Sequence, residues 1–231
     1  MLALVTLVGV AAVILVNWRR SGRQLGPFLG LGLLRVYARL FHGCVYEGQM
    51  PIPRTGAGVV ISNHTCSSDG TFIQGGCPRR GLTYLFAEEF DRPLFRWIWA
   101  TTACIPVRRG RYGDVGAART ALRRLQEGRV LVVFPEGNLS GSGLGRLRTA
   151  KCGAAYLALR ARVPVFPVWI SGGPEGPNVR RAWFWPSRAR VTFGEPIDLA
   201  PFHDRRLDRR LLEQVTLLLM QKVAATAPGK K

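Results

Sequence analysis

The chain has 231 residues, of which 47% are hydrophobic and 10% aromatic. This composition excludes a disordered protein and fits one packed domain with an attached segment. The net charge is +19, carried almost entirely by arginine, which predicts an anionic partner, either a membrane surface or a nucleic acid. Five scattered cysteines with no C-x-x-C pair predict a reducing compartment and give no zinc site.

The first segment, Met1 to Val16, is apolar apart from Thr6 and is followed by Asn17-Trp18-Arg19-Arg20. As a helix it is about 24 Å long at roughly 1.5 Å per residue, which is marginal for a bilayer core that needs about 20 residues. Because the arginines follow the apolar run, we predict a retained anchor rather than a cleaved signal peptide. If the anchor spans the cell membrane, the positive-inside rule places the rest of the chain on the cytoplasmic side.

A second apolar stretch runs from Leu25 to Phe41 and is interrupted by Arg35 and Arg39. These arginines are four residues apart and therefore share one helix face. We predict an amphipathic helix that lies in the membrane interface; the alternative is an ordinary helix packed on the core. Residues 1–45 are thus assigned to an N-terminal membrane element and residues 46–231 to the main domain.

From Gly56 onward, short apolar runs alternate with helical patterns. Asp114 is the expected cap of one helix and Gly128 its stop. The alternation predicts an α/β fold: a mixed, largely parallel sheet flanked by helices, with the N-terminal membrane-associated helical element attached. Strands are expected at 58–62, 82–87, 104–107, 130–134, 163–170 and 189–193, and helices at 93–99, 114–128, 150–161 and 204–225.

The pattern Asn63-His64-x-x-x-x-Asp69 follows the buried run Val59-Val60-Ile61. A histidine at a strand end, with a carboxylate a few residues later, can act as a general base with an orienting partner. Taken alone, the pattern also fits a polar turn in which His64 caps a helix.

Three further patches follow in order: Ile105-Pro106-Val107-Arg108-Arg109, then Phe134-Pro135-Glu136-Gly137-Asn138-Leu139-Ser140, then Val163-Pro164-Val165-Phe166-Pro167-Val168. Each lies at a predicted strand end, where α/β folds gather their sites. In this order the four patches resemble the glycerolipid acyltransferase family, typified by 1-acylglycerol-3-phosphate acyltransferase. The resemblance covers about half of the chain, from about Val59 to Val168.

The resemblance implies that His64 is the general base and that Asp69 orients its imidazole. Arg109 is implied to bind the acceptor phosphate, which suits the two-pronged grip of a guanidinium; Arg108 and Arg111 are neighbours able to share that role. Leu139 stands where the family has an arginine. The remaining implied substrate-binding residues are Glu136, Gly137, Asn138, Ser140 and Lys151, with Arg146 and Arg148 as further substitutes for the missing arginine.

The implied function is transfer of a fatty acyl group, in phospholipid synthesis, from acyl carrier protein or coenzyme A to the free hydroxyl of 1-acylglycerol 3-phosphate. The expected partners are the lysophospholipid, the thioester donor and an anionic membrane surface, with no metal, no further cofactor and no nucleic acid. Leu139 leaves another acceptor open, a lyso-aminolipid or a glycolipid.

Two other readings of the chain are kept. The charge alone supports a basic nucleic-acid-binding protein, although the sequence carries no recognisable module of that kind. Cys66 is a possible thiolate nucleophile, although the family implies none. There is no G-x-S-x-G elbow and no G-x-x-x-x-G-K-[ST] phosphate loop, which disfavours an α/β-hydrolase and a P-loop NTPase.

Overall fold

The computed structural model describes residues 15–16, 25–48, 50–77, 80–90, 104–108, 114–137, 139 and 150–229. Nearly all of the predicted anchor at 1–16 and the whole predicted helix at 93–99 lie outside these ranges. Within them, no helix combines the length and the apolar character needed to cross a membrane.

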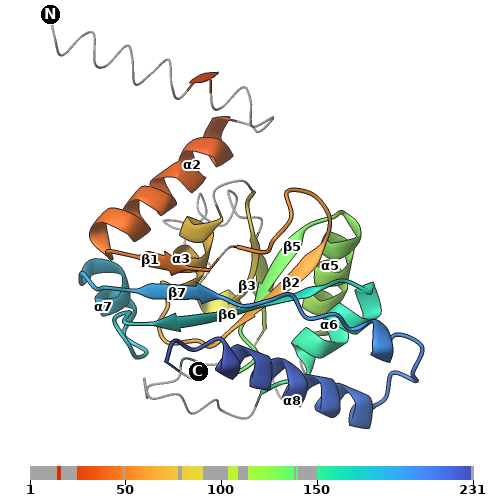
Figure 1. Ribbon diagram of the computed structural model, residues 1–231. Helices are drawn as coiled ribbons and strands as arrows, with labels where there is room; N and C mark the ends of the chain where they lie inside the picture. Colours follow the sequence, from red (N-terminus) through yellow and green to blue (C-terminus); the bar gives the residue numbers. More distant parts are fainter. Residues whose placement is uncertain are drawn as a thin grey trace, which may run out of the picture.

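A twisted sheet forms the centre of the molecule (Figure 1). Its order is β1-β7-β6-β2-β5-β3-β4, and its neighbouring strands are parallel except for β6 and β7, which are antiparallel. The predicted mixed, largely parallel sheet is therefore confirmed. The strands are β1 Val45–Glu47, β2 Gly58–Ser62, β3 Thr83–Ala87, β4 Ile105–Val107, β5 Val130–Val133, β6 Val165–Ser171 and β7 Arg190–Phe193.

Strand β2 lies in the middle of the sheet because both of its faces are apolar. All five of its residues are buried. Val59 and Ile61 pack into one hydrophobic cluster and Val60 into the other, as the alternation of side chains along a strand requires. A continuous apolar run of this kind is typical of a parallel strand that is covered on both faces.

Helices cover both faces of the sheet (Figure 1). One layer contains α5 Val115–Gln126, α6 Gly153–Ala161 and α8 Arg209–Ala225. The other contains α2 Leu25–Val36, α3 Asp69–Gly76 and α7 Val179–Phe184. Short helical turns complete the fold: the π-helical η1 at Tyr37–Phe41 and the 3₁₀ turns η2 at Glu88–Phe90 and η4 at Ala200–Phe202.

Helix caps explain where sequence expectations succeed and fail. Asp114 caps α5 as predicted, because its side chain accepts from the backbone N–H of Ala117. The expected start of the last helix at residue 204 is wrong: Asp208 is extended and accepts from the N–H of Leu211 at 2.8 Å, so α8 begins only at Arg209. Helix α3 was not predicted as an element, since three of its eight residues are glycine, a weak helix former.

Helix α2 and the turn η1 together span the second predicted helix, Leu25 to Phe41. Leu31 and Leu34 are buried on the side that faces the fold, where α2 contacts α3. A row of apolar side chains remains exposed: Leu29, Leu33, Val36 and Leu40, with exposed fractions from 46% to 81%. This row is called the α2 stripe below. The helix therefore packs on the domain with one side and presents apolar side chains on another.

Candidate active site

The candidate site lies where β2 and β5 end side by side. The two strands are parallel, with Ile61 paired to Val133. Continuing that register three residues along both strands brings His64 beside Glu136. The site is thus at the carboxyl edge of the sheet, the position where ligands bind in open α/β folds.

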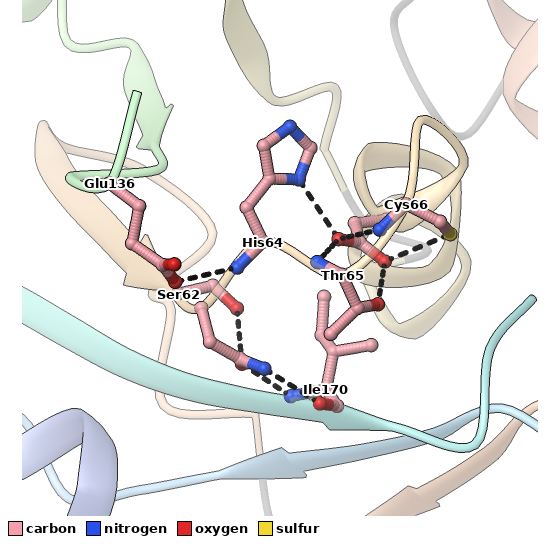
Figure 2. A network of polar contacts seen from close by, with 8 residues as sticks. Ser62, His64, Thr65, Cys66, Glu136 and Ile170 are labelled. Carbon is pink, nitrogen blue, oxygen red and sulfur yellow. Dashed lines mark hydrogen bonds and ion pairs between the residues drawn. The ribbon is translucent and has the colours of Figure 1, made fainter. Parts of the chain in front are cut away.

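His64 and Asp69 form a hydrogen-bonded pair. Nδ1 of His64 is 2.9 Å from Oδ2 of Asp69, and the exposed fractions of the side chains are 20% and 0%. Because an ionised carboxylate only accepts, Nδ1 carries the proton in this contact. Figure 2 shows the second ring nitrogen, Nε2, pointing away from Asp69. The predicted base and its orienting partner are therefore brought together with the ring held by its inner nitrogen.

Asp69 is fixed by the turn that precedes α3 (Figure 2). Its Oδ2 accepts from the backbone N–H groups of Thr65 at 2.5 Å and Cys66 at 3.0 Å. Its Oδ1 accepts from the Thr65 hydroxyl at 2.9 Å and the Cys66 thiol at 3.2 Å. Asp69 also opens α3, where the positive end of the helix dipole favours a carboxylate. These contacts hold the carboxylate in the single orientation that meets Nδ1.

Asn63 braces the end of β2 against β6. Its Oδ1 accepts from the N–H of Ile170 and its Nδ2 donates to the carbonyl of the same residue, both at 2.8 Å. The side chain thereby extends the sheet's hydrogen bonding by one step (Figure 2). Asn63 belonged to the sequence motif but had no assigned role; the structure makes it a positioning residue for His64.

Glu136 contacts the base through the backbone. Its Oε1 accepts from the N–H of His64 at 3.1 Å, and the residue is 4% exposed. Its Oε2 is buried and has no hydrogen-bond partner in the part of the chain that the structure describes. From the sequence, Glu136 was expected to orient the acceptor or neighbouring donor groups; its observed contact is with a neighbouring donor, the backbone N–H of the base.

Phe134 begins the third sequence motif but had no assigned role. Its ring stacks on the His64 imidazole, with centroids 4.0 Å apart and planes 14° apart. The available signal was its place directly after a predicted strand, at the edge where the polar residues were expected; its closeness to His64 follows from the observed pairing of β2 with β5. Stacking restricts rotation of the imidazole about χ2 and so adds to the hold of Asp69.

Gly137 and Lys151 lie against each other beside this turn. Gly137 has φ +67, a conformation that side chains other than glycine rarely adopt. A Cβ there would lie 3.0 Å from Cε and Nζ of Lys151, whose backbone N–H donates to the carbonyl of Pro135 at 2.8 Å. The exposed Lys151 is therefore brought to the Glu136-Gly137 turn.

Three predicted substrate-binding residues, Arg109, Asn138 and Ser140, lie outside the described residues. Arg108, the neighbour of Arg109 at the end of β4, is 81% exposed, and its Nε donates to Oε2 of Glu88 at 3.0 Å. Arg108 is thus already paired with a carboxylate. Among the described side chains, no group of three or more His, Cys, Asp or Glu is arranged to hold a metal ion.

The structure argues against Cys66 as a nucleophile. Cys66 is 0% exposed, and burial, together with the neighbouring Asp69 carboxylate, raises the pKa of its thiol. A protonated, inaccessible thiol is a poor nucleophile. Cys66 instead donates to Asp69 and is part of the turn that holds it.

Comparison with known proteins agrees with this geometry. The model of the acyltransferase family matches residues 44–171, more than half of the chain. The chain belongs to the acyltransferase family. The match contains the His64–Asp69 pair, the Glu136-Gly137 turn and Lys151.

The individual relatives differ in what their names describe. An N-acylphosphatidylethanolamine synthase of Arabidopsis thaliana is 31% identical over 158 residues, 61% of this chain and 55% of that protein. A 1-acyl-sn-glycerol-3-phosphate acyltransferase of Limnanthes alba is 26% identical over 173 residues, 71% of this chain and 58% of that protein. The matched regions therefore span little more than half the length of these relatives.

A solved structure shares the fold. The 1-acyl-sn-glycerophosphate (LPA) acyltransferase from Thermotoga maritima superimposes with a TM-score of 0.65 at 23% identity, over 87% of this chain and 80% of that one. At this identity the likeness establishes the α/β fold.

Proposed function

We propose that this acyltransferase moves a fatty acyl group from a thioester, acyl carrier protein or coenzyme A, to the free hydroxyl of 1-acylglycerol 3-phosphate. The observation that carries the proposal is the His64–Asp69 pair, held at 2.9 Å by a buried carboxylate at the carboxyl edge of the sheet. The relative from Limnanthes alba bears the name of this activity.

The proposed reaction is a direct transfer with base assistance. Nε2 of His64 accepts the proton of the acceptor hydroxyl as its oxygen attacks the thioester carbonyl. Asp69 stabilises the imidazolium that forms, as the carboxylate does in a Ser-His-Asp triad. The tetrahedral intermediate collapses with cleavage of the C–S bond, and the imidazolium returns the proton to the departing thiolate. The products are the ester and the free thiol, and no acyl-enzyme forms.

We assign the acceptor phosphate to the basic groups near the turn. Lys151 lies against Gly137, and Arg109 follows β4, which ends at the same edge of the sheet as β2 and β5. A guanidinium and an ammonium supply the charge that a phosphate monoester requires. We place the reaction at the cytoplasmic surface of the cell membrane, because the acceptor is a lipid and the chain has a net charge of +19.

A second acceptor class is supported by two observations. Leu139 replaces the arginine of the family motif, and one relative is named an N-acylphosphatidylethanolamine synthase. An amino group of a phospholipid can be acylated by the same base. This reading predicts turnover of an aminophospholipid and little turnover of 1-acylglycerol 3-phosphate.

An acceptor panel with the full chain tests the proposal. Each acceptor is offered with acyl-coenzyme A and acyl carrier protein thioester, and thiol release and lipid product are both measured. We expect the highest kcat/KM for 1-acylglycerol 3-phosphate and a loss of about 10²–10⁴-fold in His64→Ala. Preference for the aminophospholipid would select the second class, and unchanged turnover in His64→Ala on every acceptor would refute base catalysis by this residue.

A further inference from the structure

Helix α7 carries a surface that the proposed chemistry does not use. Phe184 and Trp185, at its end, are 78% and 65% exposed. With Asn178, Arg180 and Arg181 they line an open depression of about 470 Å³. Adjacent exposed aromatic rings are unusual on a soluble surface and mark contact sites for proteins or membranes. The group Arg180, Arg181, Phe184 and Trp185 is called the α7 patch below.

The charge around the α7 patch is positive. Residues 172–189 contain three arginines and a single acidic residue, Glu175. Residues 25–46, which include the α2 stripe, contain Arg35 and Arg39 and no acidic residue. Aromatic rings beside arginines are the composition found at the level of lipid headgroups, where the ring is partly immersed and the guanidinium meets phosphate.

The α7 patch is joined to the helix that carries the α2 stripe. The Tyr37 ring in η1 stacks on Trp183 of α7, with centroids 5.8 Å apart, and its hydroxyl donates to the Trp183 carbonyl. The buried His42 contacts Ser187, just after α7, at 2.9 Å through Nδ1, and the hydroxyl of Tyr37 at 2.9 Å through Nε2. The α2–η1 segment and α7 are thus held together at this junction.

Helix α7 is also hydrogen-bonded to the turn that precedes Asp69. The hydroxyl of Ser68, the residue before Asp69, donates to the carbonyl of Ala182 in α7 at 2.7 Å. The carbonyl of Thr65 accepts from the N–H of Gly176, just before α7, at 3.0 Å. Two hydrogen bonds therefore connect the segment bearing the α7 patch to the turn that holds the Asp69 carboxylate.

We propose that the α7 patch is a membrane contact of its own: Phe184 and Trp185 insert among the headgroups of an anionic bilayer, and Arg180 and Arg181 bind lipid phosphates. The inference rests on the proposed function, since it presumes a lipid acceptor. It adds a second point of attachment beyond the N-terminal segment. Because α7 is hydrogen-bonded to the turn that holds Asp69, this contact links the membrane surface to the catalytic turn.

An oligonucleotide is the rival occupant, because aromatic rings and arginines also bind single strands by stacking. The α2 stripe decides between them. Its four aliphatic side chains offer no face on which a base can stack, whereas acyl chains and headgroup carbons accommodate them. The exposed aliphatic side chains of α2, with the exposed aromatic rings and arginines of the α7 patch, fit a bilayer better than a nucleic-acid strand.

Fluorescence quenching reports insertion of one side chain. The full chain is mixed with phosphatidylcholine vesicles containing 30% phosphatidylglycerol, with or without bromine on the acyl chains. We expect bromolipid to quench the native chain more than Trp185→Phe, which keeps an aromatic ring but removes this fluorophore. Trp169→Phe is the matched control, because Trp169 lies on β6 and packs in the opposite hydrophobic layer. Equal quenching of the native chain and Trp185→Phe would overturn the proposal.

Vesicle flotation measures how much the α7 patch contributes to the affinity of the chain for anionic membranes. Arg180→Ala with Arg181→Ala should weaken binding to anionic vesicles about fivefold per arginine, from about 1 kcal/mol each. Phe184→Ser with Trp185→Ser should weaken it by at least about tenfold. The controls are Arg206→Ala with Arg210→Ala and Leu217→Ser, which alter exposed residues at or near α8. Equal losses in patch and control variants, or a patch effect on oligonucleotide binding alone, would overturn the proposal.

Turnover of a short-chain, monomeric acceptor separates this inference from the proposed function. If the native chain acylates the soluble acceptor but bromolipid does not quench Trp185, the proposed function stands and the α7 membrane contact is refuted. If bromolipid quenches Trp185 but the chain acylates no acceptor, the α7 membrane contact stands and the proposed function is refuted.

Discussion

Glu136 accepts a hydrogen bond from the backbone N–H of His64 at 3.1 Å, so a carboxylate after β5 positions the residue after β2. The imidazole is held separately, by Asp69 at Nδ1 and by the ring of Phe134. The base is therefore fixed from two neighbouring strands and from the following helix. Positioning of this kind supports a proton transfer whose rate depends on the distance between the base and the hydroxyl.

Two substitutions of Glu136 distinguish its role as a hydrogen-bond acceptor from the effect of its carboxylate charge. Glu136→Ala leaves the N–H of His64 without this buried partner, which costs about 1–3 kcal/mol in the free energy of unfolding. Glu136→Gln keeps a carbonyl oxygen and should lose less than half as much. Denaturant unfolding of both variants measures the difference in their free energies of unfolding. Equal values for Glu136→Ala and Glu136→Gln would show that the hydrogen bond contributes nothing to stability.

Asp69→Asn should reduce kcat by orders of magnitude through a wrong imidazole tautomer, though by less than the loss of the base itself in His64→Ala. Because the two residues act as a unit, the double variant His64→Ala, Asp69→Asn should lose little more than the worse single variant. Steady-state rates on vesicle-bound acceptor test this, with circular dichroism at the assay temperature as the folding control. Multiplicative losses in the double variant would mean that the residues act independently.

Gly137→Ala should destabilise the protein through two separable effects. The left-handed backbone costs about 1–2 kcal/mol, and the new methyl group meets the Lys151 side chain at 3.0 Å. Gly128→Ala is the matched control, since Gly128 has φ +76 and no heavy atom within 4 Å of an added Cβ. We expect Gly137→Ala to lose more than Gly128→Ala, and the excess to disappear in a Lys151→Ala background. Thermal unfolding of the four variants completes the cycle.

His42 should make stability depend on pH. Burial lowers its pKa below the usual 6.5, so the unfolded chain binds the proton more readily than the folded chain. Stability should therefore be greatest above about pH 6.5 and fall as the pH drops toward the folded pKa. Its neighbour Tyr37, whose pKa burial raises to about 12, stays neutral throughout this range.

The measurement is the midpoint of thermal unfolding between pH 7.5 and 5 for the native chain and His42→Gln. The variant should lose stability at pH 7.5, because its packing and hydrogen bonds change, yet show a shallower decline toward acid pH. Carboxylates elsewhere titrate alike in both proteins and cancel in the comparison. Parallel curves would show that His42 is not responsible for the acid sensitivity.

The sequence predicted the parts of the site that depend on strand position. The apolar run before Asn63 indicated β2, and the run before Phe134 indicated β5, so the polar residues after both strands were expected at one edge. Both expectations are met by the observed pairing of β2 with β5. His64 and Asp69 were noticed because they are close in sequence and chemically complementary, and the family resemblance supplied their expected roles.

Other parts depend on contacts between distant residues. The pairing of Asn63 with Ile170 and of Glu136 with His64 requires the strand order, which no local pattern encodes. Helix α7 has only six residues, too short for a periodic apolar pattern to stand out. The late start of α8 was missed because Asp204 and Asp208 are both acceptable caps, and only the fold selects the second.

The edge strand β1 has a consequence for the order of assembly. In the described sheet it pairs with β7, Val45 opposite Arg190, and β7 is the last of the described strands to be synthesised. Until β7 is made, β1 has no strand beside it in the described sheet, whereas α2 and its exposed stripe are already synthesised. The slow, long-range pairing of β1 with β7 is therefore a late step of folding.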